Sequence, residues 1–347
     1  MAAVSTDEEA PIIVEVEELC SEQQSKIESV DASFITLNTT TTFEQRAIER
    51  RCGEFYRAFR AIPDYPSQVL LKRGIHVAYV EKGIGGLSAG YAALDASRPW
   101  LCYWILNSLT LLGASTDAHA SRVISFLCDH CQHVDGGFCG GPAQLPHLAP
   151  SYAAVNALAS LNDPRAYEKI DRDGMYRFLL RMKSPSGGFQ MHDVGEVDVR
   201  ATYCAIAVAW MLNLLTPELT AGVADYVARC QTYEGGFGGE PWNEAHGGYT
   251  FCGLAAAVLL DCTDRLNLDL LMEWLVNRQM PMEGGFQGRN NKLVDACYAF
   301  WQGAVFPLMH SLGFAVQDTS FEELNAEEVA SKGGWLFNQE RLQEYLI

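Results

Sequence analysis

The chain has 347 residues, of which 48% are hydrophobic and 20% charged, so it can bury a sizeable core. Its formal net charge of −18 argues against a nucleic-acid surface, because phosphate recognition needs clustered Lys and Arg. The 11 cysteines are an odd number scattered along a long chain, which argues against a disulfide framework and favours a reducing compartment.

Residues 1–40 are biased towards Glu, Ser and Thr, show no sustained period and lack a secretory signal pattern. They predict a disordered acidic tail before a folded domain over 41–347. A first helix is expected from about Phe43 to Phe59, ended by Pro63. The apolar stretch Tyr103–Leu112 is short and interrupted by polar residues, which predicts a buried helix and no membrane span. We therefore expect a cytoplasmic protein.

A Gly-Gly-Phe triplet occurs four times, with its first glycine at Gly136, Gly187, Gly235 and Gly284. The separations are 51, 48 and 49 residues, a period that indicates stacked supersecondary units and not four unrelated loops. Each triplet follows a helical pattern, so we expect the paired glycines to cap these helices in left-handed conformations.

Apolar helices recur at the same period. They are expected over Leu101–Leu112, Tyr152–Leu161, Tyr203–Leu214, Tyr249–Leu260 and Tyr298–Met309, with a tyrosine near each start at Tyr103, Tyr152, Tyr203, Tyr249 and Tyr298. Helices that are apolar all round are buried on every side, whereas the alternating helices, such as Ala221–Cys230, carry charges and can face water. The alternation predicts an all-α fold: an α/α toroid (barrel) of repeated helical hairpins whose inner helices line a cavity.

Cys128 and Cys131 form a CxxC pair in one of these helical stretches. No second pair follows at zinc-ribbon spacing, so a place in the core or on the surface is favoured over a metal site.

The position three residues before each tyrosine holds mostly large or polar side chains: Trp100, Ala149, Arg200, His246 and Asp295. This slot lies one helical turn before the tyrosine, at the same end of every inner helix. Because the inner helices of such a ring point the same way, these side chains should converge at one mouth of the cavity.

The fifth copy contains Asp295 and Cys297, two zinc-ligand types, and a catalytic zinc commonly takes three protein ligands. On these residues alone, a helix-capping carboxylate and a buried thiol remain the simpler interpretation. Arg289 and Lys292 add a basic cluster, which together with His246 and Tyr298 could hold a phosphate-bearing anion. The alternative is ordinary surface charge on a loop.

Three segments closely resemble the beta subunits of protein farnesyltransferases: Asp95–Trp104, Glu244–Leu254 and Arg289–Trp301. The resemblance runs from about Tyr91 to the chain end. It implies an α/α barrel that pairs with a helical-repeat alpha subunit. It also implies transfer of a farnesyl group from farnesyl diphosphate to the cysteine of a C-terminal CaaX motif in protein substrates.

The resemblance also implies residue roles. Asp295 and Cys297 would bind Zn²⁺ and, with Tyr298, form the catalytic group. The diphosphate would be held by His246, Arg289, Lys292 and Tyr298, with Mg²⁺ as an optional companion ion. The isoprenoid would lie along Arg200, Tyr203, Cys252 and Trp301, and the peptide along Trp100, Trp104, Ser97 and Ala149. The bulky Trp100 shortens the slot, which favours farnesyl over geranylgeranyl.

The family's third zinc ligand is a histidine of a sixth inner helix, and this chain has no sixth copy. His310 lies beyond the fifth apolar run, too far along to replace it. The segment Trp335–Ile347 is expected to form an outer helix. Gly333-Gly334-Trp335 precedes a helical pattern and is therefore no repeat mark. We expect the final repeat to be missing, the ring to be open, and full activity to need the missing segment.

Three other interpretations remain. A geranylgeranyltransferase beta subunit would share the repeats, the zinc pair and the anion cluster. A truncated, non-catalytic beta subunit would only bind the alpha subunit. A terpene cyclase can adopt a similar barrel, but its chemistry needs an acidic proton donor such as a DxDD motif, which the sequence lacks.

Overall fold

The computed structural model describes residues 39–63, 70–314 and 336–347. The predicted tail over 1–40 lies outside the described residues except for its last two, and so does Gly333–Trp335. The chain divides into two units, Met1–Ala47 and Ile48–Ile347, and the following paragraphs describe the second. The first helix, α2 (Thr40–Arg60), confirms the predicted helix but ends before Pro63.

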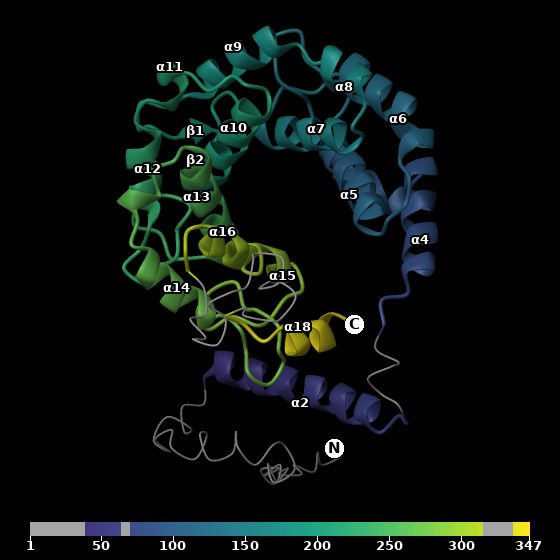
Figure 1. The fold of residues 1–347 in the computed structure, drawn as a ribbon, viewed down its shortest axis with the longest axis vertical. Helices are drawn as coiled ribbons and strands as arrows, with labels where there is room; N and C mark the ends of the chain where they lie inside the picture. Colours follow the sequence, from purple (N-terminus) through teal and green to yellow (C-terminus); the bar gives the residue numbers. More distant parts are fainter. Residues whose placement is uncertain (1–38, 64–69, 315–335) are drawn as a thin grey trace, which may run out of the picture. The chain divides into compact units, whose positions relative to one another are not determined.

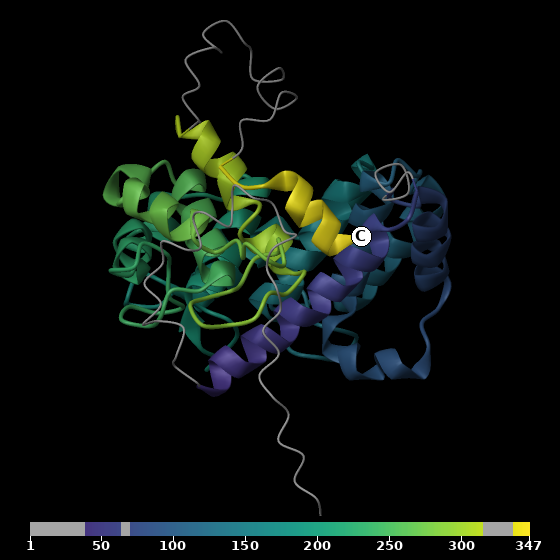
Figure 2. The same cartoon turned by 90° about the horizontal axis from the view of Figure 1, so that it is seen from below.

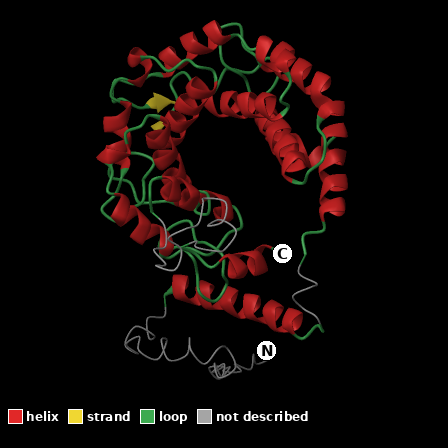
Figure 3. Cartoon of the chain, in the orientation of Figure 1, coloured by secondary structure: helices red, strands yellow, loops and turns green. Residues whose placement is uncertain are grey.

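Inner and outer helices alternate through the second unit (Figures 1 and 3). The inner helices are α5 (Arg98–Leu111), α7 (Leu148–Ser160), α10 (Val199–Met211), α13 (Gly247–Leu259), α15 (Tyr298–Trp301) and α16 (Val305–Ser311). The outer helices are α4 (Arg73–Gly85), α6 (Asp117–Ile124), α8 (Pro164–Glu168), α9 (Arg172–Met182), α11 (Pro217–Thr220), α12 (Val223–Cys230), α14 (Leu268–Val276) and α18 (Gln339–Leu346). The predicted all-α alternation is confirmed.

The remaining elements are short. They are the 3₁₀ segments η3 (Ala89–Ser97) and η5 (Thr263–Arg265), the π-helical η4 (Ser125–Cys131), and the strands β1 (Phe189–Gln190) and β2 (Val197–Asp198). The two strands pair antiparallel. Cys128 and Cys131 of η4 are both buried, which confirms the core interpretation of the CxxC pair. Among the described helices, none is long and apolar enough to cross a membrane.

The inner helices pack each against the next, α5 on α7, α7 on α10 and α10 on α13. Small residues permit this close approach: Ala153, Ala154 and Ala157 of α7 have no exposed surface. Helices with so little charge are stable only when neighbours cover them on every side. The register of the repeats therefore fixes which ends of the inner helices meet.

The Gly-Gly-Phe triplets form turns after the outer helices and do not cap them, so that part of the prediction is wrong. Helix α12 ends at Cys230, and the next residue, Gln231, is already extended. Gly235 follows four residues later with a φ of 107°. The phenylalanine pairs back to the residue after the helix, as Phe237 does with Gln231. All four phenylalanines are fully buried.

The paired glycines let each repeat contact the next outer helix. A Cβ on Gly235 would lie 2.1 Å from the backbone oxygen of Leu270 in α14, and one on Gly284 would lie 2.4 Å from that of Arg341 in α18. Helix α18 therefore follows α14 as the next outer helix, which confirms the prediction for that segment. Arg60 and Glu344 of α18, both in the second unit, lie 3.1 Å apart, and Figure 2 shows the carboxyl-terminal end of α2 next to α18.

The fifth inner helix is broken, contrary to the continuous helix predicted over Tyr298–Met309. It consists of α15 and α16 separated by residues 302–304. Pro307 explains the break, because in a continuous helix its ring would clash with the carbonyl of Gly303. At the third position of a new helix, proline loses only an N–H that has no helical partner.

The loop before each of four inner helices contains a non-glycine residue with positive φ. These residues are Ala143 (60°), Val194 (59°), Trp242 (78°) and Asn291 (58°), at the same repeat spacing as the glycines. The left-handed region is strained for bulky and β-branched side chains. Since Val194 and Trp242 are 99% and 100% exposed, no packing compensates for this strain.

Replacing Trp242 with glycine is therefore expected to stabilise the fold, by about 1 kcal/mol in the free energy of unfolding. Relief of a left-handed conformation, roughly 1–2 kcal/mol, exceeds the entropy that glycine adds to the unfolded chain. Val134→Gly is the control, because Val134 is 86% exposed but has no positive φ. Urea unfolding measures both variants. A Trp242→Gly protein no more stable than Val134→Gly would contradict the strain.

Candidate functional site

Slot residues of the inner helices contact the aligned tyrosines of their neighbours. The Trp100 and Tyr152 rings lie 5.7 Å apart, the Arg200 guanidinium lies 5.5 Å from the Tyr249 ring, and His246 Nε2 lies 3.0 Å from Tyr298 Oη. The same end of successive helices thus carries one connected layer of side chains. The contacts confirm that these three slots lie at the same end of their helices, and their convergence at one cavity mouth stays a prediction.

His246 is the N-cap of α13, and its Nδ1 accepts the backbone N–H of Gly248 at 3.1 Å. Burial and, secondly, the charge of Arg289 lower the pKa of His246. In the neutral ring the proton is therefore on Nε2, which donates to Tyr298 Oη. The hydroxyl hydrogen of Tyr298 is then available to an anion placed beside the pair.

Arg289 forms an ion pair with Glu244, a partner that the sequence argument did not include. It also lies close enough to act on both His246 and Tyr298. It adds to the effect of burial in lowering the pKa of His246, whereas burial raises the pKa of Tyr298 and Arg289 only opposes that rise. Lys292 is exposed and makes no hydrogen bond or ion pair with another described residue. The structure thus gathers Arg289, His246 and Tyr298, while the Lys292 side chain is not held in contact with them.

Arg200 is tied to α10 itself. Its Nε and Nη2 lie 3.0 and 2.5 Å from Oδ2 of Asp198, which is only 4% exposed and is the N-cap of the helix. The pKa of Arg200 is raised, chiefly by this carboxylate. Its charge is therefore largely compensated, and its guanidinium is held in place over Tyr249.

A ladder of aromatic rings crosses the inner helices. It runs through Trp100, Tyr152, Tyr203, Phe251 and Trp301, with successive centroids 5.7, 5.4, 5.4 and 5.7 Å apart. The hydroxyls of Tyr152 and Tyr203 lie 3.1 Å apart. Tilted aromatic pairs at such distances are stabilising and present a broad apolar face. We call these five residues the aromatic ladder.

The other residues predicted to line the isoprenoid and peptide sites lie near this ladder to different degrees. Trp104 packs on Trp100 with 5.7 Å between centroids and is 47% exposed. Cys252 is buried next to Tyr203. Ala149 is half-buried in the first turn of α7, and Ser97 precedes α5 without a capping bond.

Asp295 and Cys297 lie side by side at the surface. Asp295 Oδ1 accepts the Cys297 backbone N–H at 2.8 Å, and a hydrogen bond from the thiol lowers the carboxyl pKa. Burial and the carboxylate raise the pKa of Cys297 to about 11. Cys297 is nevertheless exposed to solvent, so the interpretation of it as a buried thiol is wrong.

The pair offers one oxygen and one sulfur donor, which fit zinc chemically but form only part of a site. Within the described ranges, no group of three or more His, Cys, Asp or Glu is placed to hold a metal. His310 belongs to α16 and does not complete such a group. The described residues therefore contain two donor groups suited to zinc and no closed zinc site.

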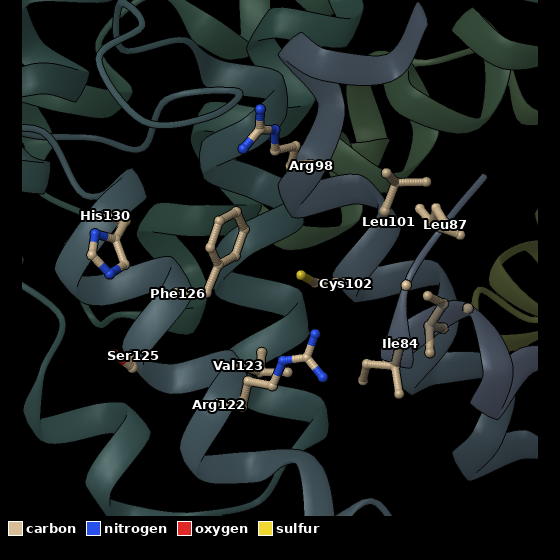
Figure 4. A pocket seen from close by; sticks show the side chains of 13 residues that line it. Ile84, Leu87, Arg98, Leu101, Cys102, Arg122, Val123, Ser125, Phe126 and His130 are labelled. Carbon is tan, nitrogen blue, oxygen red and sulfur yellow. The ribbon is translucent and has the colours of Figure 1, made fainter. Parts of the chain in front are cut away.

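A pocket of about 690 Å³ lies between α4, α5, α6 and η4. Figure 4 shows Cys102 and Phe126 near its middle, with Arg98 and Arg122 on opposite sides. Arg98 pairs with Asp95, and burial raises the pKa of Cys102 to about 11, so this thiol is protonated at neutral pH. None of the residues that line this pocket belongs to the aromatic ladder or to the predicted anion-binding residues His246, Arg289, Lys292 and Tyr298. The pocket is therefore separate from both.

Sequence reasoning missed two residues that the geometry includes. Glu244 directly precedes Ala245 and His246, but nothing in its spacing marks it as the partner of Arg289. Phe251 lies two residues after an aligned tyrosine, and only its aromatic character in an Ala-rich and Leu-rich helix could have indicated it.

Comparison with known proteins agrees with this geometry. The prenyltransferase alpha-alpha toroid domain matches residues 71–347. The chain is 52% identical over 277 residues to protein farnesyltransferase subunit beta of Arabidopsis thaliana, which covers 79% of this chain and 57% of that protein. It is 37% identical over 343 residues to the Saccharomyces cerevisiae subunit, covering 97% and 73%. The chain thus spans little more than half the length of the Arabidopsis relative.

A solved structure shows the same fold. Candida albicans protein geranylgeranyltransferase-I complexed with GGPP matches with a TM-score of 0.58 and 19% identity, covering 80% of this chain and 90% of that one. This structural match shows the fold alone, whereas the domain match and the sequence identities to beta subunits show the family. The chain therefore belongs to the prenyltransferase alpha-alpha toroid family and is a relative of the protein farnesyltransferase beta subunits.

Proposed function

We propose that this chain is the catalytic beta subunit of a protein farnesyltransferase, which joins a C15 isoprenoid to the cysteine thiol of a CaaX-type protein. The observation that carries the proposal is one connected layer of side chains. Its cationic end holds His246, Tyr298 and Arg289, and its aromatic ladder runs on from Trp301 to Trp100. An isoprenoid diphosphate has the same two parts, an anion and a long apolar chain.

The cationic end suits a diphosphate leaving group. In the transition state, negative charge develops on the oxygen that departs from the isoprenoid carbon. The Arg289 guanidinium and the Tyr298 hydroxyl, oriented by His246, are fixed donors for that charge. Donors that are placed before the reaction cost little reorganisation, which makes this kind of stabilisation large.

The aromatic ladder suits the isoprenoid chain, because its rings cover apolar carbons and exclude water from them. Its far end is closed by indoles, with Trp100 between Tyr152 and Trp104. An indole at this place limits the length of chain that fits. This supports a C15 over a C20 donor.

Asp295 and Cys297 are proposed as two ligands of a zinc ion, with the remaining protein ligand outside the described residues. A bound zinc would favour the thiolate form of the substrate cysteine, which is the nucleophile. Mg²⁺ beside the diphosphate is a further proposal.

A helical alpha subunit is the proposed partner. Exposed apolar side chains on α4 and just after it support a protein contact: Ile75, Tyr79, Leu87 and Tyr91 are 66%, 68%, 39% and 38% exposed. No residue of α4 is buried. Apolar side chains that gather on one surface are typical of interaction sites.

A competition between C15 and C20 diphosphates tests the donor proposal. The chain, with its partner, should prefer the C15 donor, and Trp100→Ala should shift the ratio of kcat/KM values towards C20 by about tenfold. That shift corresponds to roughly 1–3 kcal/mol for groups that fill an apolar pocket. Trp210→Ala is the control, because Trp210 is 54% exposed near the other end of α10. A wild-type preference for C20 would instead support a geranylgeranyltransferase.

A further inference from the structure

One repeat position differs sharply among the four copies. After each outer helix, one residue pairs through its backbone with the phenylalanine of the Gly-Gly-Phe triplet. The residue directly before that pairing residue is Cys131, Met182, Cys230 or Arg278 in the four copies. The backbone confirms the alignment, because the carbonyls of Cys230 and Arg278 both accept an N–H from the strand beyond the glycines, at 2.9 Å. Cys131, Met182 and Cys230 are at most 1% exposed.

Arg278 thus occupies a position that is small or apolar in the other repeats. It is 8% exposed, and burial lowers its pKa. The basic residues of the neighbouring repeats, Arg181 and Arg229, lie one residue earlier and are exposed. A buried charge destabilises a fold unless its hydrogen bonds are satisfied. The contacts of Arg278 therefore indicate its role.

The guanidinium of Arg278 reaches a hairpin of its own repeat. Its Nη1 lies 3.1 Å from Oε1 of Gln287 and also donates to Oδ1 of Asn290. Its Nε donates to the Trp274 carbonyl at 3.3 Å, and the group lies 5.3 Å from the Trp274 ring. The arginine is fixed on α14 and holds the hairpin at two points.

The hairpin is closed by the pairing of Gln287 with Val294, and its tip carries Arg289 and Lys292. We call residues 287–294 the cationic hairpin. Its Gly288 carbonyl accepts the N–H of Gly247, and a Cβ on Gly288 would lie 2.2 Å from the Tyr298 ring. The position of this hairpin therefore sets the distance of Arg289 from His246 and Tyr298.

Asn290 extends the contact to the preceding repeat. Its Oδ1 faces Arg278, while its Nδ2 donates to Oε1 of Glu234 in the turn of the previous Gly-Gly-Phe triplet. Arg278 and Glu234 thus compensate each other through the amide between them. These hydrogen bonds hold the hairpin between two repeats and do not involve His246, Arg289 or Tyr298.

We propose that Arg278 is a positioning residue, which fixes the cationic hairpin so that Arg289 faces the anion held by His246 and Tyr298. Arg278 itself touches no substrate. Its effect on the substrate rests on the proposed function, whereas its effect on the order of the hairpin does not.

Arg278→Met tests the proposal, because methionine is the residue of the equivalent buried position in another repeat and should preserve the fold. We expect amide hydrogen exchange of residues 287–295 to become faster. We also expect KM for farnesyl diphosphate to rise and kcat to fall, because a displaced Arg289 stabilises both the bound anion and the departing charge less well. The combined loss in kcat/KM should be about tenfold, as for partners that orient a binding group. Arg278→Lys should restore part of the affinity, since it can still donate to Asn290.

Arg229→Gln is the matched control, because Arg229 is exposed on the preceding outer helix and contacts the Ser186 carbonyl and the Tyr226 ring but no residue of the cationic hairpin. It should leave exchange of the hairpin and KM unchanged. Asn290→Ala breaks the bonds to Arg278 and Glu234 from the hairpin side and replaces Arg278→Met if that variant does not fold. Unchanged exchange and KM in the folded variants would overturn the proposal. Faster exchange of the hairpin in a chain whose wild type binds no prenyl diphosphate would support positioning while the proposed function fails.

Discussion

Arg289→Gln is expected to reduce isoprenoid transfer by about 100- to 1,000-fold in kcat, the loss typical of one preorganised donor for transition-state charge. The substitution keeps two N–H donors but removes the positive charge beside His246 and Tyr298. Single-turnover kinetics with a prenyl diphosphate and a cysteine peptide measures the effect. The pKa of His246 should also rise, because Arg289 contributes to its depression after burial.

Glu244→Gln is the control for this prediction. It removes the counter-charge of Arg289 and leaves the guanidinium in place, so transfer should persist. Titration of His246 by NMR separates an electrostatic effect from a lost fold. The electrostatic account fails if Arg289→Gln turns over within a few-fold of the wild type.

Cys297→Ala is expected to weaken zinc retention by at least about 100-fold and to abolish transfer. Loss of a direct ligand costs more than the 10- to 100-fold typical of partners that only orient ligands. The exposed position of Cys297 means that its removal leaves no large cavity, so the fold should survive. Zinc analysis of the purified complex, with circular dichroism for the fold, measures both effects.

Cys262→Ala is the matched control, because Cys262 is a half-buried thiol in a loop of the preceding repeat with no role in the proposed site. It should retain the zinc of the wild type. Stoichiometric zinc in the Cys297→Ala complex would contradict the assignment of Cys297 as a ligand. Asp295→Asn should show the same loss as Cys297→Ala, since both donors belong to one pair.

Much of the architecture could be predicted because its signals are periodic. The tyrosines and the paired glycines recur at one spacing, so the slot holding Arg200 and His246 could be located without coordinates. The structure adds the contacts of Arg200 with Tyr249 and of His246 with Tyr298, which the spacing did not predict. Periodicity also explains the errors. It predicted a continuous fifth inner helix, although Pro307 requires the break before α16.

The position of Arg278 shows where such reasoning ends. Arg278 lies six residues before Gly284, and Arg229 lies six residues before Gly235. Counting back from the first glycine of each triplet therefore aligns Arg278 with the exposed Arg229. One additional residue in the turn before Gly284 shifts it into the buried position of Cys230 instead. Partners such as Glu244 and Asn290 carry no periodic signal either, because they are set by side-chain direction in loops.

The central claim is that this layer of side chains joins an isoprenoid to a cysteine thiol. The most direct test is mass spectrometry of a CaaX peptide after incubation with farnesyl diphosphate, zinc, the full chain and an alpha subunit of the same family. The account predicts a single C15 thioether on the peptide cysteine, which is lost with Arg289→Gln. Because full activity is expected to need the third zinc ligand, its absence should lower the yield of this product but not change its identity. A stable complex of the two subunits that leaves the peptide unmodified would contradict it.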